Sequence, residues 1–404
     1  MSGPFVVLGG GVYQLPLILA ARRRGLDVLL FDGSADALGF QHATRGAVVD
    51  IADPVAVTEA AREAGAIGIA YIVTEVAVRS AAEACATLGL PSITPDVARR
   101  CTDKQAMREC FAAAGLPVPR FRAVSSTSEA MAGARELGFP LVVKPVDSSG
   151  SRGVRRCESM DELASAVDAA LASSRSRRAI LESFLDGPEY TVETYTVNGR
   201  TEILGVSDKD RLPFPHLVSI NLTYGPFADD RLRTAIGAAA VRAIEATGLE
   251  TGPGHTEVMA TPDGPVVVEV ACRGGGYRIF NDILPRISGV DPVEAVIDHA
   301  LGRTSTATPT VRRAGVLRFF NPPERGRLVS VEGVDAARKM PNVLDVVIEA
   351  TIGKPFHGIT RDGERPGYII SIADTRADAV AAADRAERAV TFTIDTAVPV
   401  GERA

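Results

Sequence analysis

Short apolar runs alternate with helical patterns along the first hundred residues, and this alternation constrains the fold more than any other feature. The apolar runs are Phe5–Leu8, Val28–Phe31 and Ile67–Val73, and helical patterns over 54–64 and 76–88 accompany them. Short strands alternating with helices are typical of a parallel sheet that is covered on both faces. The sequence therefore predicts an α/β, doubly wound sheet here, whose ligands would lie beyond the carboxyl ends of the strands.

The composition limits what the whole chain can do. Its 404 residues suggest two to four domains, and a net charge of -6 without a basic, aromatic-rich run argues against a nucleic-acid partner. The five cysteines form no Cys-x-x-Cys pair, which argues against a disulfide framework and a cysteine-bound metal. The sequence has no signal peptide and no apolar stretch near the ~20 residues of a membrane span. We therefore expect a cytoplasmic enzyme with no membrane partner.

Two linker-like segments divide the chain into three predicted domains. Pro91–Pro95 ends the first domain, 1–95, and Thr304–Pro309 separates a central domain, 96–305, from a third domain, 306–404. The central domain mixes strands and helices and contains an Asn-Gly dipeptide, which is typical of a hairpin turn. The third domain combines several strands with one helix, which predicts an α+β unit.

The glycines after the first apolar run form one candidate site. Gly9, Gly10 and Gly11 lie between a strand and a helix as in a dinucleotide fingerprint, but Gln14 replaces its third glycine. This favours a small carboxylate or amide substrate at the helix N-terminus over NAD. Glu75 follows another predicted strand, where it could pair with a substrate ammonium group or be a solvated acid at a helix start.

A lysine beside a flexible loop forms a second candidate site. Lys144 ends an apolar strand, and the loop Asp-Ser-Ser-Gly-Ser-Arg-Gly, which contains Ser149 and Gly150, follows it closely. A lysine can neutralise phosphates while the backbone N–H groups of such a loop surround them. The lysine precedes the glycines, so this is not a Walker A loop. The alternative is a surface loop with a solvated lysine, although the strand before Lys144 reads as buried.

Two glutamates in a predicted hairpin form a third candidate site. Glu257 and Glu269 each lie six residues from a turn centred on Asp263, so a symmetric hairpin would place them opposite each other. Opposed side chains have Cβ atoms roughly 4.5–5.5 Å apart, and two ionised carboxylates at that spacing need a cation between them. Such oxygen ligands suit Mg²⁺ shared with nucleotide phosphates. The alternative is an exposed hairpin with scattered acids.

The segment after this hairpin adds an arginine. Arg273 directly follows the second strand, and arginine binds carboxylate or phosphate in a bidentate manner. Gly274 and Gly275 would let backbone amides approach a ligand, although a loose turn would look the same. His255 lies two residues before Glu257 on the same face of its strand and would point toward the same cation.

A lysine, a flexible loop, an acidic hairpin and an arginine in this order resemble the ATP-grasp superfamily. The resemblance covers almost the whole chain and implies an ATP-grasp fold between a doubly wound domain and an α+β domain, with a lid over about 119–187. The chain is most similar to carboxylate–amine ligases of the L-amino-acid ligase type. The motifs are Gly-Gly-Gly-Val-Tyr-Gln-Leu-Pro, Leu-Asp-Gly-Pro-Glu-Tyr-Thr-Val-Glu and Glu-Val-x-x-Arg-Gly-Gly, together with the α+β tail.

The resemblance also implies residue roles. Lys104 and Lys144 would bind ATP phosphates, and Glu189 would bind the ribose. Glu257 and Glu269 would hold Mg²⁺ or Mn²⁺. The residues that would bind adenine are Glu182, Ser183, Phe184 and Leu185. Ser149 and Gly150 would also contact ATP. The substrate would be met by Gly10, Gly11, Glu75, Arg273, Gly274 and Gly275, and the residues expected to act in the chemistry are Arg273, Lys144 and His255.

The function implied by the resemblance is an ATP-dependent ligase. A substrate carboxylate would take the γ-phosphate to give an acyl phosphate and ADP, and an amine would then displace phosphate to form an amide, as in a dipeptide or amino-acid conjugate. The partners would be a small carboxylate, a small amine and a second copy in a homodimer. Ala271 stands where the superfamily often has an asparagine metal ligand, which would weaken one metal site. The alternatives are a biotin-carboxylase-like enzyme, a purine-pathway enzyme and an ATP-binding regulatory protein.

Overall fold

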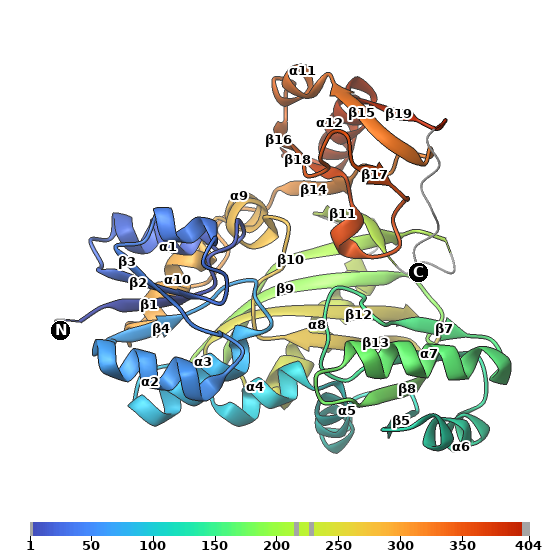
Figure 1. Cartoon of the computed structure of the whole chain (residues 1–404), viewed down its shortest axis with the longest axis horizontal. Coiled ribbons are helices and arrows are strands. Elements are labelled where there is room, and N and C mark those ends of the chain that lie inside the picture. Colours follow the sequence, from blue (N-terminus) through green and yellow to red (C-terminus); the bar gives the residue numbers. More distant parts are fainter. Residues whose placement is uncertain (1–2, 214–217, 226–229, 398–404) are drawn as a thin grey trace.

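The computed structural model describes residues 3–213, 218–225 and 230–397, and the chain begins with a parallel four-stranded sheet (Figure 1). The strand order is β3-β2-β1-β4, which confirms the predicted doubly wound sheet. The strands are β1 Phe5–Leu8, β2 Val28–Asp32, β3 Arg45–Val48 and β4 Gly68–Ala70. The sequence does not predict β3, because most of its residues are exposed and form no apolar run. The outermost residues of the predicted first and third domains, 1–2 and 398–404, lie outside the described residues.

Alternate side chains of β1 pack on opposite faces of this sheet. Phe5 and Val7 belong to the core that includes α1, whereas Val6 and Leu8 belong to the core that includes α2 and α3. These helices are α1 Leu15–Arg23, α2 Pro54–Ala64 and α3 Ala77–Leu88. Because both faces are covered, every side chain of β1 is buried and the strand reads as a continuous apolar run.

The chain next forms two short helices where the sequence predicts one helix over 96–114. They are α4 Pro95–Thr102 and α5 Lys104–Ala113. Asp103 between them is extended, and its carboxylate accepts a hydrogen bond from the amide of Ala106 (3.0 Å), which caps α5. The amide of Lys104 donates to the carbonyl of Val146 (2.8 Å). The break therefore places Lys104 at the start of a helix, next to the serine- and glycine-rich loop.

A small antiparallel sheet with its own core forms the segment predicted to be the lid. Its strand order is β5-β8-β6-β7, and α6 and α7 pack on it. The elements are β5 Phe121–Val124, α6 Thr127–Leu137, β6 Leu141–Pro145, β7 Arg155–Cys157, α7 Met160–Ser173 and β8 Ala179–Ser183. This sheet is separate from the large central sheet, which it faces in Figure 1.

The central sheet has eight strands in the order β13-β12-β9-β10-β11-β14-β18-β16. Its first five strands are β9 Glu189–Val197, β10 Arg200–Arg211, β11 Ser219–Tyr224, β12 Gly252–Thr261 and β13 Gly264–Ala271. The helices that follow the sheet or pack on it are α8 Asp230–Thr247, α9 Leu284–Ser288 and α10 Pro292–Ala300. β11 pairs with β14 from Asn221↔Arg318 to Tyr224↔Gly315. The sheet is therefore continuous across residue 306, where the sequence predicts a domain boundary.

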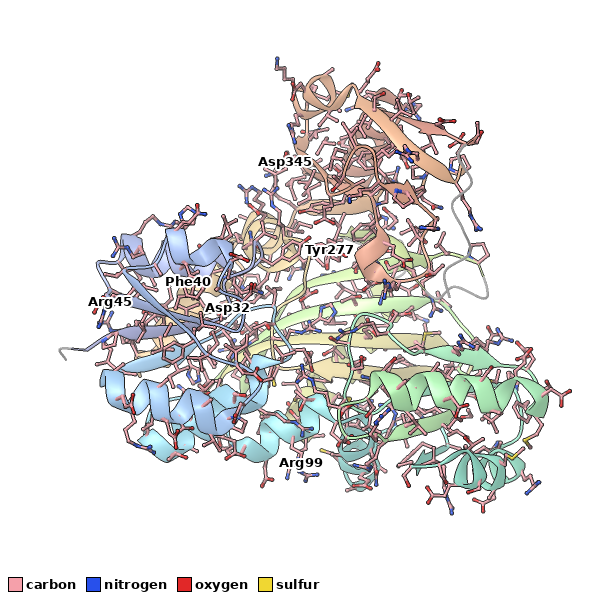
Figure 2. The ribbon with its side chains drawn as sticks, in the orientation of Figure 1. Asp32, Phe40, Arg45, Arg99, Tyr277 and Asp345 are labelled. Atoms are coloured by element: carbon pink, nitrogen blue, oxygen red, sulfur yellow. The ribbon has the colours of Figure 1, made fainter. Side chains whose placement is uncertain are left out.

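The C-terminal segment, 306–397, completes the sheet and adds a three-stranded one. Its elements are β14 Ala314–Phe319, β15 Gly326–Glu332, α11 Val334–Arg338, β16 Val343–Ile348, β17 Pro355–Phe356, β18 Gly367–Ala373, α12 Arg376–Ala389 and β19 Thr391–Asp395. Figure 2 shows Tyr277 where this segment meets the central sheet. Among the helices described, none is long and apolar enough to cross a membrane.

Candidate active site

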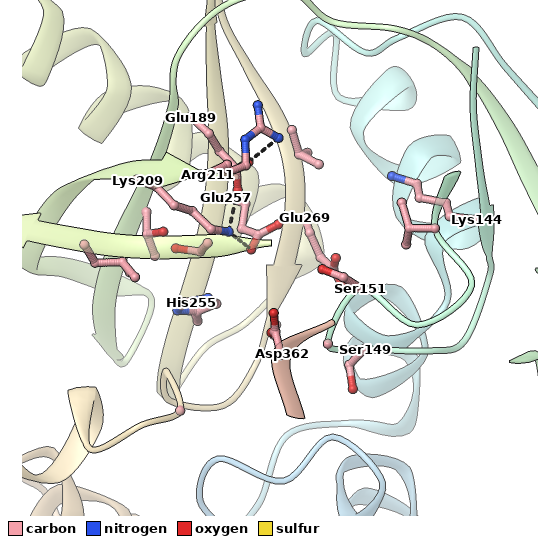
Figure 3. Close-up of a pocket in the computed structure, with 18 of the residues that line it drawn as sticks. Lys144, Ser149, Ser151, Glu189, Lys209, Arg211, His255, Glu257, Glu269 and Asp362 are labelled. Carbon is pink, nitrogen blue, oxygen red and sulfur yellow. Dashed lines mark hydrogen bonds and ion pairs between the residues drawn. The ribbon is translucent and has the colours of Figure 1, made fainter. Parts of the chain in front are cut away.

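A cavity of about 440 Å³ lies where the lid, the central sheet, the first sheet and the C-terminal segment meet (Figure 3). The predicted site residues that line it are Glu75, Lys104, Lys144, Ser149, Gly150, Glu182, Ser183, Phe184, Leu185, Glu189, His255, Glu257, Glu269 and Arg273. The predicted substrate residues Gly10, Gly11, Gly274 and Gly275 are described but do not line it. The fold therefore gathers most of the predicted site in one place.

At the lid end of the cavity, a buried carboxylate lies between two cations. Glu182 on β8 accepts from Nζ of Lys144 (2.7 Å) and from Nε of Arg108 (2.7 Å). Burial opposes ionisation of Glu182, but the two cations outweigh it and lower its pKa to about 2. Burial, opposed by Glu182 but reinforced by Arg108 and Lys104, lowers the pKa of Lys144. Sequence reasoning missed Arg108. The one pattern that could have indicated it is its position four residues after Lys104, which places both side chains on the same face of the helix.

The segment predicted to hold adenine follows β8 along the cavity wall. Ser183, Phe184 and Leu185 all line the cavity. The amide of Phe184 already donates to the carbonyl of Pro140 (3.1 Å), and the carboxylate of Glu182 is engaged by its two cations. Both groups therefore already have protein partners, and the adenine role of this segment stays a prediction.

The predicted hairpin brings Glu257 and Glu269 opposite each other. Its turn has two residues, Pro262 and Asp263, and regular pairing from that turn would set Glu257 against Val268. A β-bulge next to Glu257 shifts the register by one residue and restores the pairing with Glu269. Val268, the extra residue of the bulge, accepts a hydrogen bond at its carbonyl from Nη2 of Arg108 (2.5 Å). The predicted pairing is confirmed, and it depends on a bulge that symmetry alone did not reveal.

Each of these glutamates contacts a lysine. Nζ of Lys209 lies 2.6 Å from Glu257, and Nζ of Lys104 lies 3.1 Å from Glu269. Burial opposes ionisation of Glu257, but Lys209, His255 and Lys104 lower its pKa to about 2. Burial also disfavours the charged form of Lys104, yet the nearby glutamates, Glu269 foremost, raise its pKa. These contacts favour the charged forms of Glu257 and Lys104.

Two cations on β10 complete this network and were missed by sequence reasoning. Lys209 and Arg211 both contact Glu189, at 2.5 and 2.8 Å. Sequence reasoning ends this strand at Val206, because the following Ser-Asp-Lys-Asp-Arg run reads as a polar loop. β10 instead continues to Arg211. The signal that could have found them is their period-two spacing, which directs both side chains to one face of a strand.

The acidic pair fits a divalent cation. Glu257 and Glu269 are opposed, line the cavity and each contact a lysine, so they present oxygen donors of the kind that Mg²⁺ takes. Among the described residues, no three His, Cys, Asp or Glu side chains converge as a site made by protein alone. Phosphate oxygens and water would therefore have to complete the coordination, as is usual for Mg²⁺ at nucleotide sites.

The opposite end of the cavity holds two further ion pairs. Nε of Arg273 donates to Glu75 (2.9 Å), so the two residues predicted to meet substrate contact each other. Burial opposes the charge on Arg273, but Glu75 and Glu269 outweigh it and raise its pKa. Nδ1 of His255 lies 2.7 Å from the buried carboxylate of Glu193. His255 therefore lies near Glu257, and the contact with Glu193 on β9 fixes the orientation of its ring.

The glycines predicted to approach substrate have structural roles. The amide of Gly10 donates to Asp32 (2.7 Å), and a Cβ on Gly10 would lie 2.9 Å from Leu30. A Cβ on Gly274 would lie 2.1 Å from Phe280, which occupies the space expected for a ligand. Gly275 packs against Glu193 and His255, and the exposed Gly11 adjoins Gln14. Gly276, the next residue, lines the cavity and has no atom within 4 Å of a built Cβ.

Comparisons with known proteins agree with this arrangement. A family model described as an ATP-grasp domain matches residues 137–281, and one described as L-amino acid ligase C-terminal domain 2 matches residues 318–395. The first match covers the lid strand β6 through the acidic hairpin and Arg273. The second covers most of the C-terminal segment.

Similar proteins fall in the same group of folds. A curated protein of Sinorhizobium fredii, described as uncharacterized protein y4rH, is 33% identical over 303 residues, which are 73% of this chain and 62% of that protein. The chain thus matches less than two thirds of that relative's length. The crystal structure of an L-amino acid ligase from Bacillus licheniformis has a TM-score of 0.82 at 22% identity and covers 98% of this chain and 99% of that one. A phosphoribosylglycinamide synthetase from Anaerococcus prevotii has a TM-score of 0.76 at 16% identity, with coverage of 97% and 100%.

Proposed function

Because the chain belongs to the ATP-grasp superfamily, we propose that it is an ATP-dependent carboxylate–amine ligase that forms an amide and releases ADP and phosphate. One observation carries the proposal. A single cavity joins two buried lysines and an acidic hairpin at one end to the Arg273 turn at the other. This geometry suits transfer of a terminal phosphate to a carboxylate held by the arginine.

The lysines and the loop would bind the triphosphate. Lys144 and Lys104 are buried, charged and directed into the cavity by Glu182 and Glu269, so both are oriented before ATP arrives. Backbone groups of the loop around Ser149 and Gly150 line the same end. These cations would neutralise charge on the phosphoryl group while a substrate carboxylate attacks it, which gives an acyl phosphate and ADP.

Glu257 and Glu269 would hold Mg²⁺. When bound, the ion would neutralise the charge that develops on the phosphoryl group. The protein's own contribution is to hold the two carboxylates opposite each other, through the contacts with Lys209 and Lys104 and through the β-bulge.

The second half-reaction would take place at the arginine end. Arg273 is charged and anchored by Glu75, so its guanidinium could hold the reacting carboxyl group and stabilise the oxyanion formed when an amine attacks. His255, fixed by Glu193, lies within reach of the same region. Closure of the lid over the cavity would exclude water, which would otherwise hydrolyse the acyl phosphate.

Purine-pathway and biotin-carboxylase-like activities are the competing candidates, since enzymes of these kinds share the fold. The match of residues 318–395 to an L-amino acid ligase domain favours the amino-acid ligase. ADP release that depends on added amino acids supports the proposal, whereas release that depends on bicarbonate supports a carboxylase. ATP binding without turnover on any of these would indicate a regulatory protein.

The decisive experiment traps the activated carboxylate. The protein, ATP, Mg²⁺ and each of the twenty L-amino acids are incubated with hydroxylamine, and hydroxamate is measured together with ADP. With ¹⁸O in the carboxylate of the substrate, one label should appear in the released phosphate. If the label stays in the organic product or AMP accumulates, the acyl-phosphate ligase is wrong.

A further inference from the structure

The C-terminal segment contributes a cationic side chain to the cavity. Arg365 lines it and is only 5% exposed. Its Nε and Nη2 donate to the carbonyl of Ser219 at 3.0 and 2.7 Å, and Nη2 also lies 2.9 Å from a carboxylate oxygen of Asp362. The two N–H groups of Nη1 take no part in these three contacts. The protein therefore holds the guanidinium in place through Nε and Nη2.

Aromatic rings fix the same guanidinium from another side. Its central carbon lies 3.8 Å from the centre of the Phe319 ring and 5.0 Å from that of Tyr277. The hydroxyl of Tyr277 donates to the backbone carbonyl of Asp362 (2.8 Å), which ties the 3₁₀ turn Asp362–Glu364 to the cavity wall. Leu222 and Leu317 also line this part of the cavity. A charge surrounded by apolar groups attracts an opposite charge more strongly than it would in water.

The other described cations of the cavity already have roles in the proposed reaction. Lys104 and Lys144 would bind the triphosphate, Lys209 and Arg211 are paired with Glu189, and Arg273 would hold the carboxyl group that reacts. If the amine substrate is itself an amino acid, it brings a second carboxylate that does not react. That carboxylate needs a cation that the first half-reaction leaves available.

We propose that Arg365 binds the non-reacting carboxylate of an amino acid that acts as the amine substrate. The proposal rests on the proposed ligase function and adds the residue that selects this substrate over an amine without a carboxylate. Asp362, about one third exposed beside the guanidinium, would lie near the ammonium group of the same zwitterion. The aromatic and aliphatic wall around Arg365 would favour an apolar side chain on that amino acid.

The test compares two amines in the wild-type protein and in variants. The best amine found among the twenty L-amino acids is compared with its own α-amide, which lacks the carboxylate. The wild type should use the acid with a KM lower by about 10- to 100-fold, the range of a charge-assisted hydrogen bond. Arg365→Met should remove most of this preference by raising the KM for the acid and not that for the amide.

Controls separate this proposal from the ligase proposal. Hydroxamate formation in the absence of an amine substrate measures the first half-reaction alone. Because Arg365 has no part in that step, the Arg365→Met variant should still form hydroxamate. Arg361→Met is the matched control, because Arg361 is exposed on the same turn, pairs with Glu364 and does not line the cavity. Arg365→Lys keeps the charge without the fork and should give an intermediate preference, which preserves the test if the methionine variant does not fold.

Equal use of acid and amide by the wild type would overturn the proposal, and so would a loss of hydroxamate in a folded Arg365→Met protein. If the wild type itself forms no hydroxamate with any carboxylate, the ligase proposal fails first.

Discussion

Arg108 connects the lid strand β8 to the acidic hairpin, and its removal should be costly. The side chain is fully buried, and it contacts both the carboxylate of Glu182 and the carbonyl of Val268 in the bulge of the acidic hairpin. Breaking a buried ion pair by removing one partner costs about 3–5 kcal/mol. Because Lys144 still neutralises Glu182, we expect Arg108→Met to lower the free energy of unfolding by about 3 kcal/mol, the lower end of that range.

The pKa of Glu182 reports the combined effect of Arg108, Lys144 and burial on the ionisation of this carboxyl group. A decrease from 4.5 to about 2 corresponds to about 3 kcal/mol of stabilisation by ionisation, at about 1.4 kcal/mol per pKa unit. The folded pKa lies below the unfolded one, so this stabilisation is complete above about pH 5 and is lost as the pH falls toward 2. The difference in stability between wild type and Arg108→Met should therefore be largest near neutral pH and shrink below pH 4.5.

Urea unfolding followed by circular dichroism at several pH values measures these differences. Arg99→Met is the matched control, since Arg99 is an exposed arginine on α4 and its loss should change stability by about 0.5 kcal/mol or less. Arg108→Met should also raise the KM for ATP, because Glu182 and the hairpin lose their common anchor. A folded variant within about 1 kcal/mol of wild type at neutral pH would refute the reasoning.

Three further predictions concern the cavity. Lys144→Met should abolish turnover while circular dichroism still reports a folded chain, and wild-type ADP release would contradict its role at the phosphates. Glu269→Gln should remove most activity and raise the Mg²⁺ concentration needed for half-maximal rate, and an unchanged requirement would contradict a metal role. Glu75→Ala should alter amino-acid preference more than the KM for ATP, because it frees Arg273 from its anchor, and an unchanged substrate profile would count against it.

Sequence patterns predicted the parts of this site that lie on apolar strands. Lys144 and the hairpin acids Glu257 and Glu269 follow or interrupt buried strands, and the strand pattern locates such residues directly. The pairing of the two acids came out correctly although the turn is shorter than assumed, because the β-bulge compensates by one residue. No sequence pattern signals such a bulge, since it depends on contacts such as that between Val268 and Arg108.

The residues that the sequence did not reveal depend on distant contacts. Lys209 and Arg211 sit in a charged run that reads as a loop until Glu189 is seen beside it. Arg365 reaches the cavity only through the packing of the C-terminal segment on the central sheet. The packing of Gly274 against the ring of Phe280 was also not predicted, because Phe280 comes from the helix beyond the turn. The substrate role of Gly274 and Gly275 stays a prediction. The two domain boundaries, the homodimer and the cytoplasmic location stay predictions.

The pairing of β11 with β14 covers a sheet edge and also brings the C-terminal segment to the cavity, so solubility and the assembly of the active site depend on the same contact. A chain cut at residue 305 would keep β11 but lose β14, β18 and β16, and the backbone groups between Asn221 and Tyr224 would become an open sheet edge. Open edges of this kind pair with other chains and promote aggregation. The C-terminal segment is therefore an edge cover as well as a wall of the cavity. Mutations that loosen it should be selected against as aggregation hazards even where they leave the catalytic groups intact.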